Sequence, residues 1–161
     1  MATMQKITPF LWFDHQAEEA ASFYVSLFEG SRIVTVSRYG AGAPRPKGSA
    51  MVVEFELCGQ RFQALNGGPV FKFTEAISLV VHCESQAEVD KLWSALTANG
   101  GQESQCGWLK DRFGLSWQIV PIRFLELMQD PDPAKAGRVM AAMMKMKKFD
   151  VAELERAHAG A

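Results

Sequence analysis

One short phrase occurs twice in this sequence. GQRFQAL occupies residues 59–65 and GLSWQIV occupies residues 114–120. Each phrase has a glycine, two variable residues, a large aromatic residue, a glutamine and two small or aliphatic residues. A glutamine within an apolar strand loses free energy unless its carboxamide finds hydrogen-bond partners. The repeat therefore predicts a duplicated strand that carries a polar side chain at a matching position.

The elements around this phrase recur as well. The tripeptide QAE stands at residues 16–18 and again at 86–88, which are 70 positions apart, whereas the two glycine phrases are 55 positions apart. The Gly- and Pro-rich loop 39–49 lengthens the first copy and accounts for the difference. Because a strand, a helix and three strands are predicted in the same order around both copies, duplication explains the sequence better than chance.

The boundaries of the predicted elements follow from apolar periodicity and from Gly and Pro residues. In the first copy, strands are expected at 7–13, Arg32–Arg38, Ala50–Leu57 and Gln60–Asn66, and a helix at 16–28. In the second copy, strands are expected at 76–82, 102–106, 108–111 and 115–120, and a helix at 85–98. Ser85 is expected to cap that helix, with Glu88 as its capping-box partner.

The chain after Pro121 is helical in pattern throughout. Asp132 before Pro133 and Asp150 before Glu153 are signals for helix starts. One apolar stripe is expected on the helix that follows Asp132; its members are Val139, Met140, Met143, Met144 and Met146. Core packing or a contact between subunits explains this stripe better than a ligand surface.

Composition narrows the class of protein. The chain has 161 residues, 48% hydrophobic residues and a net charge of −1, which indicates a globular core and argues against a nucleic-acid-binding domain. No apolar run approaches the ~20 residues of a membrane span, and residues 1–14 do not read as a secretion signal. The three cysteines form no C-x-x-C pair. A reduced, cytoplasmic protein is the expectation.

Four stretches carry a resemblance to a known family: LWFDHQAEEAASFY, LNGGPVFKF, CGWLKDRFGLSWQIVP and MMKMKKFDVAELERA. The sequence resembles the PhnB-like branch, also described as 3-demethylubiquinone-9 3-methyltransferase-like, of the vicinal-oxygen-chelate superfamily. That superfamily includes glyoxalases, bleomycin-resistance proteins and extradiol dioxygenases. The resemblance spans about residues 7–158.

The resemblance implies an α+β fold in which two βαβββ modules form a glyoxalase-like curved sheet. We expect the modules, at about residues 5–66 and 75–121, to form one domain over residues 1–121, followed by a helical tail at 122–161. It also implies a homodimer, and the apolar stripes of the tail are expected to contribute to it.

Metal-dependent members of this superfamily place their ligands on the first and last strand of each module. The resemblance puts these positions at Thr8 (or Pro9), Gln63, Ala76 and Gln118. None of these residues is a histidine or a carboxylate. Because a divalent transition metal binds weakly to neutral oxygens alone, we expect no resident catalytic metal and no other cofactor.

Strand alternation separates the cavity from the core. If Gln63 and Gln118 face the cavity, then Phe62 and Trp117 face the core. Further residues expected on the cavity side are Thr8, Phe10, Trp12, Arg61, Leu65, Ala76, Ser78, Val80, His82, Ser116 and Val120, and Trp108 is an aromatic-wall candidate. The expected cavity has apolar and aromatic walls and a few polar groups, which suits a small organic ligand.

Several of these residues have two interpretations. Gln63 and Gln118 either recognise a ligand or bond to each other, to water or to backbone. His82 is either a general base or an exposed polar strand end, and Trp108 is either cavity wall or core. Cys83 follows His82 directly, but adjacent strand residues point to opposite faces, which argues against a catalytic dyad.

The expected function is binding of an unidentified small organic molecule without a catalytic metal, with Gln63, Gln118, Phe10, Trp12, Val80, His82 and Trp108 as ligand-binding residues. The alternatives are a metal-dependent lyase, isomerase or dioxygenase, a sequestering protein of the drug-resistance type, and an S-adenosylmethionine-dependent methyltransferase. The last is disfavoured because GAGAP, at residues 40–44, lacks the following helix of a glycine-rich nucleotide loop and reads as a hairpin loop. No partner nucleic acid or membrane is expected.

Overall fold

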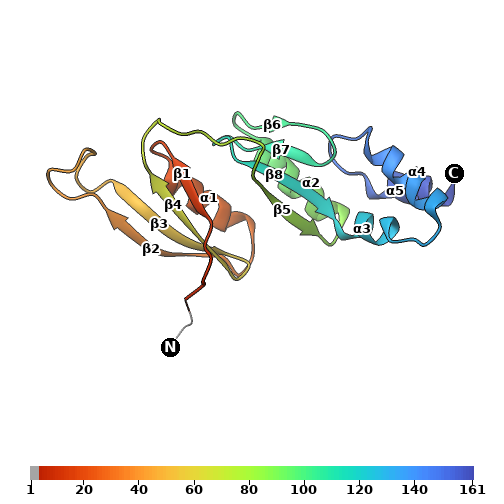
Figure 1. Ribbon diagram of the computed structural model, residues 1–161, viewed down its shortest axis with the longest axis horizontal. Coiled ribbons are helices and arrows are strands. Elements are labelled where there is room, and N and C mark those ends of the chain that lie inside the picture. The colour runs from red at the N-terminus through yellow and green to blue at the C-terminus, as the bar shows by residue number, and fades with distance from the viewer. Residues whose placement is uncertain (1–3) are drawn as a thin grey trace. The chain divides into compact units, whose positions relative to one another are not determined.

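The computed structural model describes residues 4–161 and divides into two compact units, one that runs to Lys72 and one from Phe73 to Ala161 (Figure 1). The first unit contains β1 (Phe10–Phe13), α1 (Ala17–Leu27), β2 (Arg32–Arg38), β3 (Ala50–Leu57) and β4 (Gln60–Asn66). Its sheet has the order β1-β4-β3-β2, in which only the β1–β4 pair is parallel.

The second unit repeats this order and then extends it. It contains β5 (Ser78–Cys83), α2 (Gln86–Thr97), β6 (Gln102–Glu103), β7 (Trp108–Lys110) and β8 (Ser116–Pro121), arranged as β5-β8-β7-β6 with a parallel β5–β8 pair. Three further helices follow: α3 (Ile122–Met128), α4 (Pro133–Met143) and α5 (Val151–Ala159). The predicted α+β fold with two βαβββ units is confirmed.

The strand register confirms the duplication residue by residue. In the first unit Phe10 is paired with Gln63, and in the second Val80 is paired with Gln118. Phe10 and Val80 are 70 positions apart and the glutamines are 55 apart, as the two offsets in the sequence require. The bounds predicted for β2, β3 and β4 are also confirmed.

The first strand of each unit begins later than predicted. β1 starts at Phe10 because Pro9 has no N–H to give to the ladder. Before it, the Gln5 side chain takes the place of strand backbone, with Oε1 accepting from the Arg61 N–H and Nε2 donating to the Arg61 carbonyl, both at 3.1 Å. β5 starts at Ser78, since the Ala76 N–H bonds to the Thr74 hydroxyl in a local turn (3.3 Å).

β6 is shorter than predicted and ends at Glu103 rather than residue 106. Cys106 has a positive φ of 58°, which no strand residue adopts. Its N–H donates to the Met146 carbonyl at 2.8 Å. The segment that would have continued the strand is therefore bound to the C-terminal extension instead.

In the first unit, α1 packs closely on the sheet because its inner face is made of small residues. Ala17, Ala20 and Ala21 are fully buried, and Tyr24 closes the same face. The sheet residues that pack in this core are Val53, Phe55, Phe62 and Ala64. Phe62 is thus a core residue, as predicted.

Asn66 at the end of β4 is only 6% exposed and links α1 and β3 by hydrogen bonds. Its Oδ1 accepts from the Ala17 N–H at the start of α1 (2.8 Å), and its Nδ2 donates to the Ala50 carbonyl at the start of β3 (3.0 Å). One carboxamide therefore satisfies two buried backbone groups that would otherwise lack partners.

In the second unit, α2 starts as predicted, with the Ser85 hydroxyl accepting from the Glu88 N–H. Trp117, 1% exposed, lies in the core, as predicted. Its indole N–H donates to Asp111 Oδ2 at 2.9 Å, and Asp111 Oδ1 accepts from the N–H groups of Phe113 and Leu115. The buried carboxylate thus fixes the turn that leads into β8.

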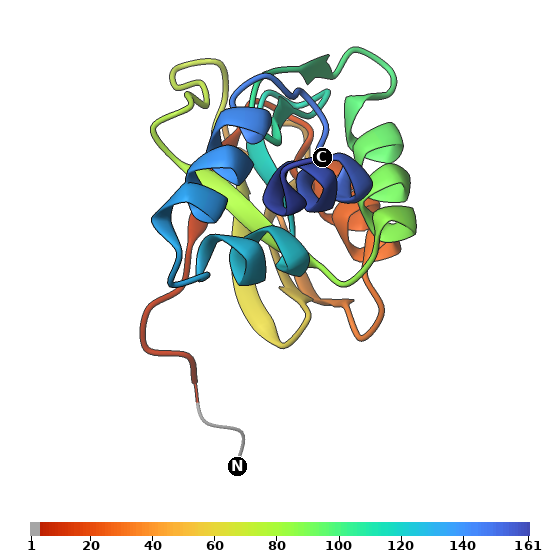
Figure 2. The same cartoon turned by 90° about the vertical axis from the view of Figure 1, so that its right-hand side faces the viewer.

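The C-terminal extension, residues 122–161, belongs to the second unit, and its three helices pack against one another (Figure 2). Together with Val120 of β8 they form a separate cluster of buried side chains. Asp132 and Asp150 cap α4 and α5, as predicted. The buried members of this core are Val120, Leu127, Val139, Met146, Phe149 and Leu154. Met146 was predicted on the helix that follows Asp132, but that helix ends at Met143, so this residue reaches the core from a turn. No helix among residues 4–161 has the length and apolar character that a membrane crossing requires.

We predict that Asn66→Ala lowers the free energy of unfolding by about 2–4 kcal/mol. The substitution leaves the Ala17 N–H and the Ala50 carbonyl buried without partners, and each such group costs about 1–3 kcal/mol. Urea denaturation measures the effect, and Gln60→Ala, at an exposed position of the same strand, is the control. A loss no larger than that of the control would contradict the role assigned to Asn66.

We also predict that Met146→Ala destabilises the protein by about 2–4 kcal/mol, whereas Met144→Ala costs less than about 1 kcal/mol. The two residues are of the same type and two positions apart, but Met146 is 7% exposed and Met144 is 61% exposed. Equal losses in thermal or urea unfolding would show that the extension lacks the core described here.

Candidate functional site

The candidate site in the first unit lies on the open face of the sheet, opposite α1. Phe62 and Ala64 are buried on the helix side, so Gln63 projects from the other side together with Arg61 and Leu65. Gln63 stands between Phe10 on β1 and Glu54 on β3. The predicted orientation of this strand is confirmed.

A hollow of about 760 Å³ opens on this face. The residues that line it come from the N-terminal segment and from β3 and β4: Met4, Gln5, Lys6, Thr8, Glu54, Glu56, Gly59, Arg61 and Gln63. The volume lies within the range of sites for small organic molecules, about 300–1,000 Å³. Most of these side chains are polar, which differs from the apolar wall expected from the sequence.

Two carboxylates on β3 form a network of ion pairs with arginines at the hollow. Arg61 Nη1 contacts Glu54 Oε1 at 2.7 Å, Arg61 Nε contacts Glu56 Oε1 at 3.6 Å, and Arg32 Nε contacts Glu56 Oε2 at 3.2 Å. This network holds the Arg61 guanidinium beside Gln63. Neither glutamate was predicted as a site residue, although their alternation with Val53 and Phe55 in VVEFEL indicates that they lie on the face of β3 that turns away from the helix.

The two matching glutamines differ in their hydrogen bonds. Gln118 Nε2 donates to the Ser78 hydroxyl on the neighbouring strand β5 at 2.9 Å. Within residues 4–161 the Gln63 side chain makes no hydrogen bond. Part of Gln118 is therefore committed to structure, whereas the whole Gln63 carboxamide is available to a ligand.

The predicted match between the first strands of the two modules was wrong at one position. Thr8 and Ala76 were predicted as equivalent first-strand positions, but both lie before their strands begin. The offset of 70 positions that the structure bears out pairs Thr8 with Ser78 instead. The same offset, read from the QAE repeat, already indicates in the sequence that Ser78 rather than Ala76 matches Thr8.

Phe10 and Trp12 both lie on β1 but have different surroundings. Phe10 is 53% exposed and stands beside Gln63. Trp12 donates its indole N–H to the Gly68 carbonyl at 2.9 Å and meets the Phe71 ring edge-on, with centroids 4.9 Å apart. A Cβ on Gly67 would lie 2.4 Å from the Trp12 ring, so the LNGGP motif is explained by the packing of this tryptophan.

In the second unit, Val80 and Trp108 flank Gln118 in the register, as Phe10 and Glu54 flank Gln63 in the first. Val80 is 45% exposed, and His82 is exposed near the end of β5. Trp108 is half-buried on the face that Gln118 shares. The proposed ligand contacts of these residues stay predictions.

Val120 and Ser116 were both predicted on the cavity side, but both are buried. Val120 is 8% exposed because the C-terminal extension packs on it, and Ser116 is fully buried. The sequence could not show this for Val120, since its cover comes from helices that the module pattern does not contain.

Cys83 is separated from His82 as the strand alternation predicts. The thiol is fully buried, whereas His82 is exposed. Burial, with a smaller contribution from the charge of Glu88, raises the pKa of the Cys83 thiol to about 12. A thiol with that pKa is not ionised at neutral pH and cannot act as a nucleophile.

The residues present do not fit a catalytic metal. Among residues 4–161 no three His, Cys, Asp or Glu side chains come together in a way that could hold an ion. The carboxylate closest in register to Gln63 belongs to Glu54, and it already forms an ion pair with Arg61. A cation here would have to displace a guanidinium in order to gain one anionic ligand.

The model of one family matches residues 5–120, which is most of the chain; this is the family described as 3-demethylubiquinone-9 3-methyltransferase. The chain belongs to this family. The predicted resemblance to the PhnB-like, 3-demethylubiquinone-9 3-methyltransferase-like proteins is thereby confirmed. No match to a curated protein was found.

Solved structures support this assignment. A PhnB protein from Bacillus cereus, which carries the same methyltransferase name as the family, is 39% identical with a TM-score of 0.68 and covers 73% of this chain and 99% of its own. A protein from Pseudomonas aeruginosa (22% identity, TM-score 0.59, 73% and 98%) and a gene product from Arabidopsis thaliana (18%, 0.50, 73% and 99%) share the fold. The family model ends at residue 120, directly before the C-terminal extension.

We predict that the native protein resists thiol labelling at Cys83 at pH 8, because its pKa of about 12 leaves almost no thiolate. Cys58, which is exposed in the β3–β4 turn, should react first. Mass spectrometry after a pulse of iodoacetamide measures both sites. Labelling of Cys83 at the rate of Cys58 would contradict the burial described here, and labelling in denaturant is the control for reactivity.

Proposed function

We propose that this protein binds a small organic molecule on the open face of its first unit, without a catalytic metal. The observation that carries the proposal is the unpartnered Gln63 carboxamide in a hollow of about 760 Å³. A carboxamide offers one acceptor and two donors, so it can recognise a carbonyl, hydroxyl or amide of a ligand.

The neighbours of Gln63 define the chemistry that suits this hollow. Arg61, held in place by Glu54 and Glu56, supplies donors to a polar group. Phe10, exposed beside Gln63, supplies an apolar contact on the other side. A molecule with one polar and one apolar end matches this order of side chains.

The corresponding face of the second unit has a smaller set of free groups. Gln118 keeps its carbonyl oxygen for a ligand, because only Nε2 bonds to Ser78. Val80 and Trp108 supply apolar surface beside it. We propose a secondary role for this face. The homodimer and a sequestering role of the drug-resistance type stay predictions.

The family name favours a second candidate, transfer of a methyl group from S-adenosylmethionine. A typical enzyme of that class needs alternating strands and helices with a glycine-rich turn after the first strand. The GAGAP segment instead lies in the loop between the antiparallel strands β2 and β3. We therefore place this candidate second. Calorimetric titration with millimolar S-adenosylmethionine decides it, and saturable binding would promote it to first.

We predict that Gln63→Ala abolishes or weakens, by about tenfold, the binding of hits from a library of small organic fragments. The loss of two or more hydrogen bonds is worth about 1–3 kcal/mol. Ligand-observed NMR measures the binding. Gln60→Ala is the matched control, because Gln60 is exposed at the start of the same strand and does not line the hollow. Equal loss in both variants would overturn the role of Gln63.

We also predict that protein purified without a polyhistidine tag contains far less than one transition-metal ion per chain. Elemental analysis by mass spectrometry measures this content. One tightly held ion per chain that is lost in both Gln63→Ala and Gln118→Ala would contradict the proposal and favour a metal-dependent lyase, isomerase or dioxygenase.

A further inference from the structure

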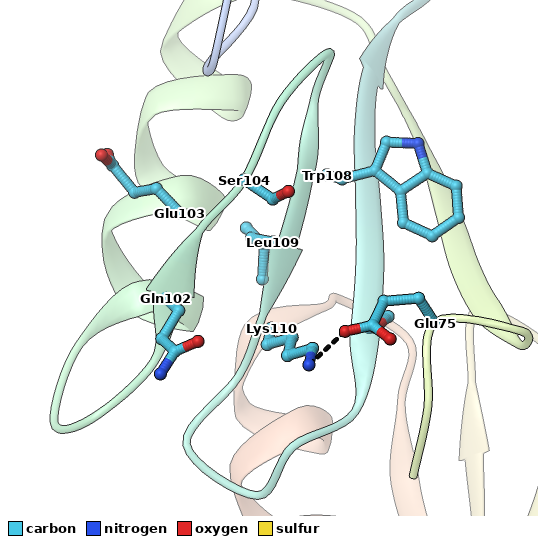
Figure 3. Close-up of a pocket in the computed structure, with 8 residues that line it drawn as sticks. Glu75, Gln102, Glu103, Ser104, Trp108, Leu109 and Lys110 are labelled. Atoms are coloured by element: carbon cyan, nitrogen blue, oxygen red, sulfur yellow. Dashed lines mark ion pairs between the residues drawn. The ribbon is translucent and has the colours of Figure 1, made fainter.

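A second pocket, in the other unit, contains a buried hydroxyl that has no partner. Ser116 is fully buried, and its Oγ is the only side-chain nitrogen or oxygen atom within residues 4–161 found buried without a hydrogen bond. It lines a pocket of about 160 Å³. Figure 3 shows residues around this pocket from β6, from β7 and from the segment before β5. Because burying a hydroxyl without a partner costs free energy, this atom points to a group that is bound there.

The strand register places three different chemical groups around this hydroxyl. Lys110 stands opposite Ser116 in the antiparallel β7–β8 pair, so both side chains leave the same face of the sheet. Trp108, two residues earlier on β7, shares that face. Glu75, from the segment before β5, approaches from the other side and forms an ion pair with Lys110 (Figure 3).

The Lys110–Glu75 pair can be opened at little cost. The two side chains are 37% and 59% exposed, and ion pairs this accessible to water contribute little to stability. The Lys110 ammonium, which bonds to the Glu75 carboxylate, lowers the pKa of that carboxyl group and so favours its charged form. A ligand that offers each of them an opposite charge therefore replaces the pair without leaving a charge unpaired.

We propose that this pocket binds a small zwitterion of the α-amino acid type. Its carboxylate accepts hydrogen bonds from Lys110 Nζ and the Ser116 hydroxyl, and its ammonium group donates to the Glu75 carboxylate. Trp108 packs against its carbon atoms. The pocket volume is close to the ~150 Å³ of a cavity that holds benzene, so alanine fits and larger side chains must extend out of the opening.

Titration of the full chain with alanine, followed by two-dimensional amide NMR, tests this proposal. We expect saturable shifts at the backbone amides of residues 108–110 and 115–117 and at the Trp108 indole. Propionate and ethylamine are the two halves of alanine, because each lacks one of its charged groups. We expect each to bind at least tenfold more weakly than alanine, since it leaves Glu75 or Lys110 without its partner.

Three variants separate the contributions. Ser116→Ala should weaken alanine binding by about tenfold while the protein stays folded, because it removes one hydrogen bond and one unsatisfied group. Lys110→Gln should abolish saturable binding. Glu75→Gln, at an exposed position, should reduce the affinity for alanine to that for propionate. Lys91→Met, an exposed lysine on α2 outside the pocket, is the matched control and should bind alanine like the native chain.

The proposal is overturned if alanine gives no saturable shift at these amides, or if Ser116→Ala binds it as tightly as the native chain. Either result would leave a water molecule as the partner of Ser116. Amides of β4 around Gln63 report the first hollow separately, so failure here is distinguishable from failure of the proposed function.

Discussion

The parallel pairing of the first and last strand in each unit is the constraint on which the rest of the structure depends. It fixes Phe10 beside Gln63 and Val80 beside Gln118. Because side chains alternate along a strand, this register also decides that Phe62 and Trp117 lie in the core. A slip by one residue would bury both glutamines and expose both aromatic residues, at a cost of several kcal/mol for each unit.

Much of this arrangement could be predicted from local patterns. The bounds of β2, β3 and β4, the caps at Ser85, Asp132 and Asp150, and the orientation of both glutamines depend on periodicity and on hydrogen-bonding chemistry that neighbouring residues carry. The starts of β1 and β5 were wrong because they depend on contacts of Gln5 and Thr74, side chains that substitute for strand backbone.

The residues that the sequence could not place are those whose environment comes from a distant segment. From the sequence, Val120 was predicted at an open strand position, yet helices that follow the stretch matched by the family model cover it. The ion pairs at the hollow join side chains from three strands, β2, β3 and β4, so they can be recognised only once the register of these strands is known. Their members are Arg32, Glu54, Glu56 and Arg61. The prediction, which placed Arg61 on the cavity side, therefore missed the two glutamates that pair with it beside Gln63.

Duplication gave the two units the same frame, and their side chains have since diverged. Gln118 bonds to Ser78, whereas Gln63 has no such partner among the described residues. Glu54 in the first unit corresponds to Trp108 in the second, so a charged hollow in one matches an aromatic wall in the other. Shared ancestry thus explains the scaffold of both units, and the replaced side chains explain why we assign them different ligands.

Hydrogen exchange of the two glutamine side-chain amides tests this account most directly. NMR resolves the Nε2 protons of Gln63 and Gln118 separately and gives the exchange rate of each. The account predicts that Gln63 exchanges at nearly the rate of a free glutamine, whereas Gln118 exchanges several times more slowly because Nε2 donates to Ser78. Equal rates for the two, or slower exchange at Gln63, would contradict the claim that Gln63 is the glutamine left free for a ligand.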